Sequence, residues 1–140
     1  MRLWHKDLIP YLPRQQLLGQ WRELCCIAKN IATNDTPNHI LVNKIMDYGI
    51  WHLNTYASAI YSEMTRRGYD VDWNKYHRWI NNPYVIPMGS IFPNWHNDRY
   101  FWQCYYNLQE KYDCGGLTDE EWGTIVDGVN HLYRRRACKP

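Results

Sequence analysis

Apolar residues recur at intervals of three and four in three stretches of this chain, at about residues 14–29, 48–67 and 98–112. This spacing gathers them on one face of an α-helix, so each stretch is predicted to be helical. The apolar stripe of the first stretch consists of Leu17, Leu18, Trp21, Leu24, Cys25 and Ala28. The polar residues that fall off this stripe are Gln16, Gln20, Arg22 and Glu23.

Residues with known capping roles mark the helix ends. Gly68 follows two arginines, which is typical of a helix C-terminus, because the cations there face the negative end of the helix dipole. Thr118 is followed three residues later by Glu121, and this capping box predicts a further helix over 119–135.

The other segments are less regular. Pro10 and Pro13 disfavour a regular helix before residue 13. Asn, Asp and Pro residues predict a loop over 31–38. Short helices are expected near 40–46 and 73–79, with irregular structure after the second of them.

No stretch alternates apolar and polar residues as a half-buried strand does, so essentially no sheet is expected. A chain of 140 residues has room for one domain with its own core, and no repeat or linker divides it. The predicted fold is therefore all-α, a single compact domain over 1–140 with about three main helices and long irregular loops.

Composition restricts the function only weakly. The net charge of +2 is too small to indicate a nucleic-acid partner, although a local basic surface is compatible with it. The chain contains 12 Tyr and 8 Trp against 2 Phe, and rings with a polar tip suit both cores and ligand sites. The aromatic residues of 95–112 fall at helical spacing, which favours core packing over stacking on a displaced base.

The cysteines and histidines indicate a reduced protein without a metal. The five cysteines are odd in number and form no CxxC pair, which favours a cytoplasmic location, in a bacterial cytosol or a phage-infected cell. The chain has no long apolar run and no signal peptide, so no membrane partner is expected. The six histidines form neither an HxxxH nor an HExxH pair, so we expect no metal and no other cofactor.

An N-terminal amine is a ready nucleophile for carbonyl-like carbons. Its ordinary pKa is about 7.8, against about 10.4 for lysine, so a useful fraction is unprotonated near neutral pH. It can therefore form an imine without burial, provided that the fold presents it in a pocket. Every chain has such an amine, so the residues around it decide whether it has a role.

Three segments resemble a known family. The run Gln-Gln-Leu-Leu-Gly-Gln-Trp-Arg-Glu-Leu at 15–24 is similar to the first long helix of the pyrimidine-dimer DNA glycosylases of the phage endonuclease V type. The opening Met-Arg-Leu at 1–3 resembles their basic start. The run Glu-Met-Thr-Arg-Arg-Gly-Tyr at 63–69 resembles the end of their next helix. The resemblance covers the first half of the chain.

The resemblance implies a DNA repair glycosylase with AP lyase activity. Met1 would supply the amine that attacks the sugar, expels the base and leaves an imine, and β-elimination would then cut the strand. Glu23 would be the catalytic carboxylate, stabilising positive charge and moving protons. Gly19, one turn before it, leaves room where a sugar could approach. Without the resemblance, Glu23 is interpreted as a solvated helix glutamate.

The resemblance also implies the partner, double-stranded DNA with a damaged or modified base, bound by a monomer. Arg2 and Arg22 would contact phosphates beside the lesion, with Arg14 and Gln15 near the same surface. Read without the family, each arginine is an ordinary surface residue, and for Arg14 this interpretation is favoured.

Three departures from the family pattern bear on the substrate. Arg2 is large and disfavours removal of the initiator methionine, so Met1 itself is the expected nucleophile. The pair Cys25-Cys26 replaces a Pro-Arg pair, which removes one phosphate contact, and Gln16 stands where a histidine often does. The target is therefore a pyrimidine dimer or another damaged or modified pyrimidine. The alternative function is a non-catalytic helical module that binds DNA or a protein.

Overall fold

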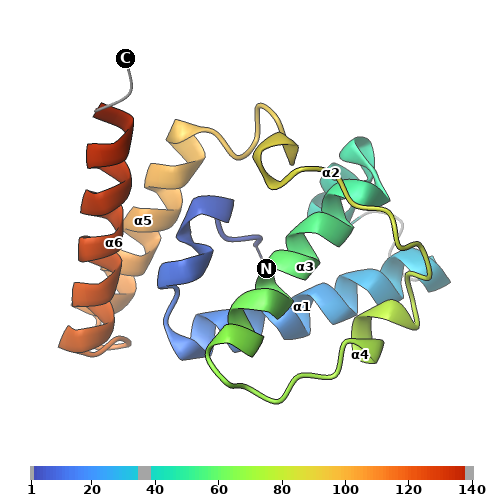
Figure 1. Ribbon diagram of the computed structural model, residues 1–140, viewed down its shortest axis with the longest axis horizontal. Helices are drawn as coiled ribbons and strands as arrows, with labels where there is room; N and C mark the ends of the chain where they lie inside the picture. The colour runs from blue at the N-terminus through green and yellow to red at the C-terminus, as the bar shows by residue number, and fades with distance from the viewer. Residues whose placement is uncertain (1, 35–38, 138–140) are drawn as a thin grey trace.

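The computed structural model describes residues 2–34 and 39–137, with side chains as far as Arg134. Within these residues every regular element is a helix, as the sequence predicts (Figure 1). The elements in chain order are η1 (Lys6–Tyr11), α1 (Arg14–Thr33), α2 (Ile40–Tyr48), α3 (Ile50–Arg66), α4 (Asn74–His77), η2 (Met88–Ser90), α5 (Asp98–Asp113) and α6 (Asp119–Ala137).

Two details of the prediction are corrected. In place of about three main helices, the described chain has four of sixteen residues or more, which are α1, α3, α5 and α6. The loop expected over 31–38 begins later, because α1 continues to Thr33 and ends where Asn34 adopts a left-handed conformation with φ 54°. The remainder of that loop, 35–38, lies outside the described residues.

The segment before α1 is also more regular than the prolines suggested. Residues 6–11 form the 3₁₀-helix η1 with Pro10 inside it. Proline cannot donate a backbone hydrogen bond, which disfavours an α-helix, but a short 3₁₀ turn is compatible with it. The His5 side chain caps this turn by accepting a hydrogen bond from the Asp7 N–H at 3.1 Å.

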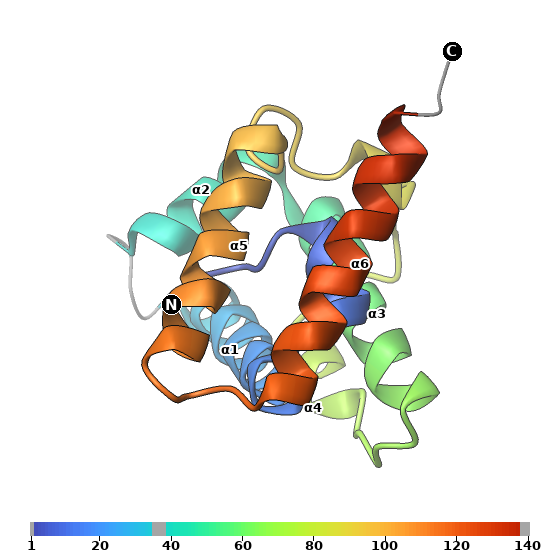
Figure 2. The same ribbon diagram turned by 90° about the vertical axis from the view of Figure 1, so that its left-hand side faces the viewer.

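Residues 2–13, the opening segment before α1, form part of the hydrophobic core. Helix α1 packs against α3, α2 and α4, while η1 packs against both α3 and α6. Figure 1 shows η1, in dark blue, between the α5–α6 pair and α3, and Figure 2 shows α6 crossing in front of it. Leu3 and Leu8 are fully buried. The backbone between Arg2 and α1 therefore runs through the interior rather than over the surface.

The patch at 63–69 has a structural role in this arrangement. Glu63 is almost buried and pairs with Arg66 and Arg67. Burial alone would raise the pKa of Glu63, but the hydrogen bonds from the two arginines outweigh it and hold the pKa below its usual value. Arg67 also donates to the carbonyls of Leu12 at 2.8 Å and Pro10 at 3.1 Å. The end of α3 thereby fixes η1.

Close contact between η1 and α6 leads to a stability prediction. A methyl group at Gly128 of α6 would lie 2.4 Å from the Tyr11 ring of η1. We expect Gly128→Ala to lower the free energy of unfolding by about 1–3 kcal/mol, the usual cost of overpacking. Gly123→Ala on the same helix meets open space and should raise it by about 0.5–1 kcal/mol. Urea unfolding of both variants checks this, and equal changes would contradict the packing described.

Among the described helices, none combines the length and the apolar character that crossing a membrane requires.

Candidate active site

Two buried side chains and one partly buried side chain hold the backbone of residues 2–4. Gln20 on α1 accepts a hydrogen bond from the Trp4 N–H at 2.8 Å and donates one to the Arg2 carbonyl at 3.0 Å. Tyr56 on α3 donates to the Trp4 carbonyl at 2.6 Å. Tyr100 on α5 donates to the Leu3 carbonyl. Three helices thus fix the position of this segment through its peptide groups, whatever side chains it carries.

Glu23 shares a donor with this segment. The Gln20 side-chain nitrogen that binds the Arg2 carbonyl also lies 3.3 Å from a carboxylate oxygen of Glu23. Glu23 is half-buried, whereas Gln20 is 1% exposed. The Gln20 side-chain amide therefore bridges the Glu23 carboxylate and the Arg2 carbonyl.

The position of Gln20 corrects the sequence analysis. Gln20 follows Leu17 by three residues and precedes Leu24 by four, so it lies on the buried face of α1 rather than off it. A polar residue at such a position was the available signal, because a buried amide must find partners for its hydrogen-bonding groups. The two partner tyrosines had no comparable signal, since they come from distant parts of the chain.

The tyrosines of this arrangement remain neutral donors. Burial raises the pKa of Tyr56 well above its usual value, and the nearby Tyr100, Cys104 and Glu23 raise it further. Burial likewise raises the pKa of Tyr100. A neutral hydroxyl can donate a hydrogen bond to a peptide carbonyl, so the segment keeps these two contacts throughout the neutral pH range.

Glu23 borders an open face of α1. Gln15, Gly19, Arg22 and Cys26 recur on this face at intervals of three and four, and all are at least partly exposed. A methyl group at Gly19 would meet nothing within 4 Å. A ligand can therefore approach the helix closely beside the carboxylate.

A cleft of about 590 Å³ opens beside residue 2, and the Arg2 side chain lines it. Its cations are Arg2, Lys44 and Arg99, and no carboxylate of the described residues lines it. The Arg2 guanidinium lies over the Trp4 ring, 5.2 Å from its centroid. Arg2 thus belongs to both parts of the site, because its side chain lines the cleft while its carbonyl shares the Gln20 amide with Glu23.

The residues predicted for the site are distributed as follows. Met1 lies outside the described residues. Arg2 and Glu23 come together through Gln20. Gln15 and Arg22 are exposed on the open face of α1. Arg14 is exposed but lies over the ring of Tyr69, 5.5 Å from its centroid, on a different side of the helix.

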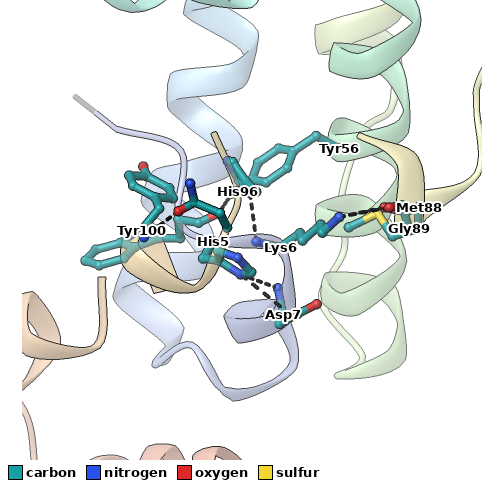
Figure 3. Close-up of polar contacts among 10 residues, drawn as sticks. His5, Lys6, Asp7, Tyr56, Met88, Gly89, His96 and Tyr100 are labelled. Carbon is teal, nitrogen blue, oxygen red and sulfur yellow. Dashed lines mark hydrogen bonds and ion pairs between the residues drawn. The ribbon is translucent and has the colours of Figure 1, made fainter. Parts of the chain in front are cut away.

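Beside the site, two histidines pack against each other in the core. The rings of His5 and His96 stack with centroids 5.1 Å apart. His96 Nδ1 accepts a hydrogen bond from the Lys6 N–H at 3.1 Å, and burial, with the charges of His5 and Lys6, lowers the pKa of His96 to about 2. Figure 3 shows the Lys6 amine directed toward Met88 and Gly89, whose carbonyls it contacts. These residues support the opening segment, and Lys6 is not among the residues that line the cleft beside Arg2.

The arrangement defines a helical protein in which a positioned carboxylate and a cation-lined cleft both lie beside residue 2. Such a site is suited to a ligand that bears phosphates. A comparison with protein families finds that the model described as pyrimidine dimer DNA glycosylase matches residues 1–77. This match covers more than half of the 140 residues. The chain belongs to the pyrimidine dimer DNA glycosylase family.

The matched residues extend from the opening segment through α4 and include Arg2, Gln20 and Glu23. The resemblance noted in the sequence is thereby confirmed, and membership of this family implies a DNA repair glycosylase that acts on DNA. Comparisons with curated proteins and with solved structures give no match. Helices α5 and α6 lie beyond the matched part.

Proposed function

We propose that this protein is a DNA glycosylase with AP lyase activity that uses the amine of Met1 as nucleophile and Glu23 as catalytic carboxylate. One observation carries the proposal: a single buried amide, that of Gln20, binds both the carbonyl of Arg2 and the carboxylate of Glu23. Met1 is bonded to Arg2, so the residue that bears the amine is tethered to the anchored segment beside the carboxylate.

The proposed reaction proceeds in two stages. The Met1 nitrogen forms a bond to C1′ of the damaged nucleotide, and the glycosidic bond to the base breaks, with a proton delivered to the departing base. The sugar ring opens to give an imine. Loss of a proton from C2′ then expels the 3′ phosphate and breaks the C3′–O bond, after which water releases the sugar fragment from the amine.

Glu23 accounts for the proton transfers in this scheme. A carboxylate beside the sugar stabilises the positive charge of the imine and carries protons between the amine, the ring oxygen and C2′. Gln20 acts as a positioning residue, because its amide orients the carboxylate without reaching the reacting atoms. The open surface at Gly19 leaves space for the sugar.

The open face of α1 is the proposed contact with the DNA backbone. Arg22 and Gln15 lie on it beside Glu23, and the Arg2 side chain would contact a phosphate from the neighbouring cleft. Contacts of this kind position the duplex without reading its sequence. A target base inside a duplex must leave the stack before a nucleophile reaches its sugar. We expect the protein to act as a monomer.

Cys26 provides a gain-of-function test of this face. It stands where the family resemblance places an arginine, and it is exposed one turn after Arg22. We expect Cys26→Arg to add one phosphate contact, which steepens the dependence of log affinity on log salt by about 0.9. Affinity for duplex DNA, measured over a range of salt concentrations, checks this. Cys114→Arg, at the exposed end of α5, is the matched control and should leave the slope unchanged.

The proposed reaction is tested with three duplexes that carry a cyclobutane pyrimidine dimer, an abasic site or no damage. We expect strand cleavage at the abasic site, cleavage at the dimer with release of the base from the sugar, and none in the undamaged duplex. Cleavage of the abasic duplex alone would support the lyase activity. It would also indicate that the glycosylase acts on a modified pyrimidine other than the dimer. Salt-sensitive binding without cleavage of any duplex would contradict the proposal in favour of a non-catalytic DNA-binding module.

A further inference from the structure

The cleft beside residue 2 has a second wall that the proposed reaction does not use. Helix α2 contributes Lys44, and the start of α5 contributes Arg99, while Arg2 completes the set of cations. Within the part of the chain that the structure describes, no Asp or Glu lines the cleft, and none of the three cations takes part in a salt bridge. Uncompensated cations around a concave surface concentrate positive potential there and attract an anion.

Aromatic rings rather than carboxylates support two of these cations. The Lys44 amine lies 5.2 Å from the centroid of the Trp95 ring, and the Arg2 guanidinium lies at the same distance from that of Trp4. A ring attracts the cation through its face and leaves the N–H donors unpaired. Arg2 shares one side-chain hydrogen bond with Cys104, so the Lys44 donors and the other donors of Arg2 remain available to oxygen atoms of a ligand.

The cleft suits a phosphodiester backbone better than a stacked base. Trp95 is only 8% exposed, and Lys44, Tyr48 and Tyr100 lie against its ring. A base would have to displace these neighbours to stack there. The polar groups on the same wall, from Asn94, Asn97 and Gln103, add donors of the kind that commonly contact phosphate and sugar oxygens.

We propose that Lys44 and Arg99 each bind a backbone phosphate of the DNA in the cleft that Arg2 also lines. This inference rests on the proposed function, because it assumes that Arg2 brings the same DNA molecule to both surfaces. It extends the DNA contact into α5, beyond the residues that the family match covers. The proposed contact with the DNA backbone then includes this cleft as well as the open face of α1.

The test uses a duplex with a tetrahydrofuran abasic analogue, which binds but cannot form an imine. Each lost phosphate contact lowers the slope of log affinity against log salt by about 0.9, so Lys44→Gln with Arg99→Gln should lower it by about 1.8. The charge-preserving pair Lys44→Arg with Arg99→Lys should retain the slope. Lys111→Gln, in the last turn of the same helix as Arg99, is the control and should leave the slope unchanged.

The outcomes separate this inference from the proposed function. Borohydride trapping on a true abasic duplex is measured in parallel, at DNA concentrations that saturate each variant. A lower slope with trapping retained supports the phosphate contacts, and a lower slope in a protein that never traps supports them while contradicting the proposed reaction. An unchanged slope and affinity in the double variant overturns the inference even where the wild-type protein traps normally. An equal loss of slope in Lys111→Gln overturns it as well, because the effect would then be general rather than local to the cleft.

Discussion

Replacing Glu23 by Gln is expected to slow strand cleavage at an abasic site by about 10²-fold or more, the contribution usually made by a positioned acid–base group. The substitution preserves the shape of the side chain and an oxygen that can accept the hydrogen bond from the Gln20 amide, 3.3 Å away in the native protein. The fold and the position of the opening segment should therefore be unchanged. What is lost is the negative charge and the ability to take up a proton.

The measurement is the single-turnover rate of cleavage with enzyme in excess, together with affinity for the tetrahydrofuran duplex. Glu110→Gln, the same chemical change at an exposed position on α5, should cleave at the wild-type rate. A Glu23→Gln protein that cleaves within about threefold of wild type would remove Glu23 from its proposed role. A large loss of affinity with an unchanged rate would assign Glu23 to binding.

Blocking the amine of Met1 is expected to abolish covalent trapping and strand cleavage while leaving DNA affinity nearly intact. Acetylation converts the amine into an amide, whose nitrogen is no longer nucleophilic and cannot form an imine. A chain extension before Met1 removes the same amine by placing it in a peptide bond. The phosphate contacts of the open α1 face do not depend on the amine, which is why binding should persist.

A reversible block provides the control for this prediction. An extension that a protease removes without leaving an extra residue should give an inactive protein that regains full activity after cleavage. Mass spectrometry of the restored protein confirms that Met1 is its first residue. Full activity in the extended protein would show that the reaction does not use this amine.

The sequence predicted the long helices because their evidence is local. Helix α5 was predicted from apolar spacing, and α6 from its capping box, in which the Thr118 and Glu121 side chains each bind the other's backbone N–H. The separate short helix near 40–46 was also predicted, but the break before the next helix was placed near residue 47 rather than at Gly49, which has φ 109°. Boundaries of this kind depend on single backbone angles that a periodic pattern does not record.

The site was predicted only in part, for a related reason. Glu23 and Arg2 were identified through the resemblance of short runs to a family, not through their physical environment. The support from Gln20, Tyr56 and Tyr100 depends on three helices meeting at residues 2–4. Nothing in the sequence distinguishes Lys44 and Arg99 from other cations. They are brought to the same cleft only when α2 and α5 come together in the fold.

The most direct test of the account is to identify the residue that becomes joined to the DNA. The protein is incubated with a duplex that carries one abasic site, the imine is reduced with borohydride, and the crosslinked peptide is mapped by mass spectrometry. The account predicts a crosslink on the α-nitrogen of Met1. A crosslink on a lysine side chain such as that of Lys6, or the absence of any crosslink while the DNA stays bound, would contradict it.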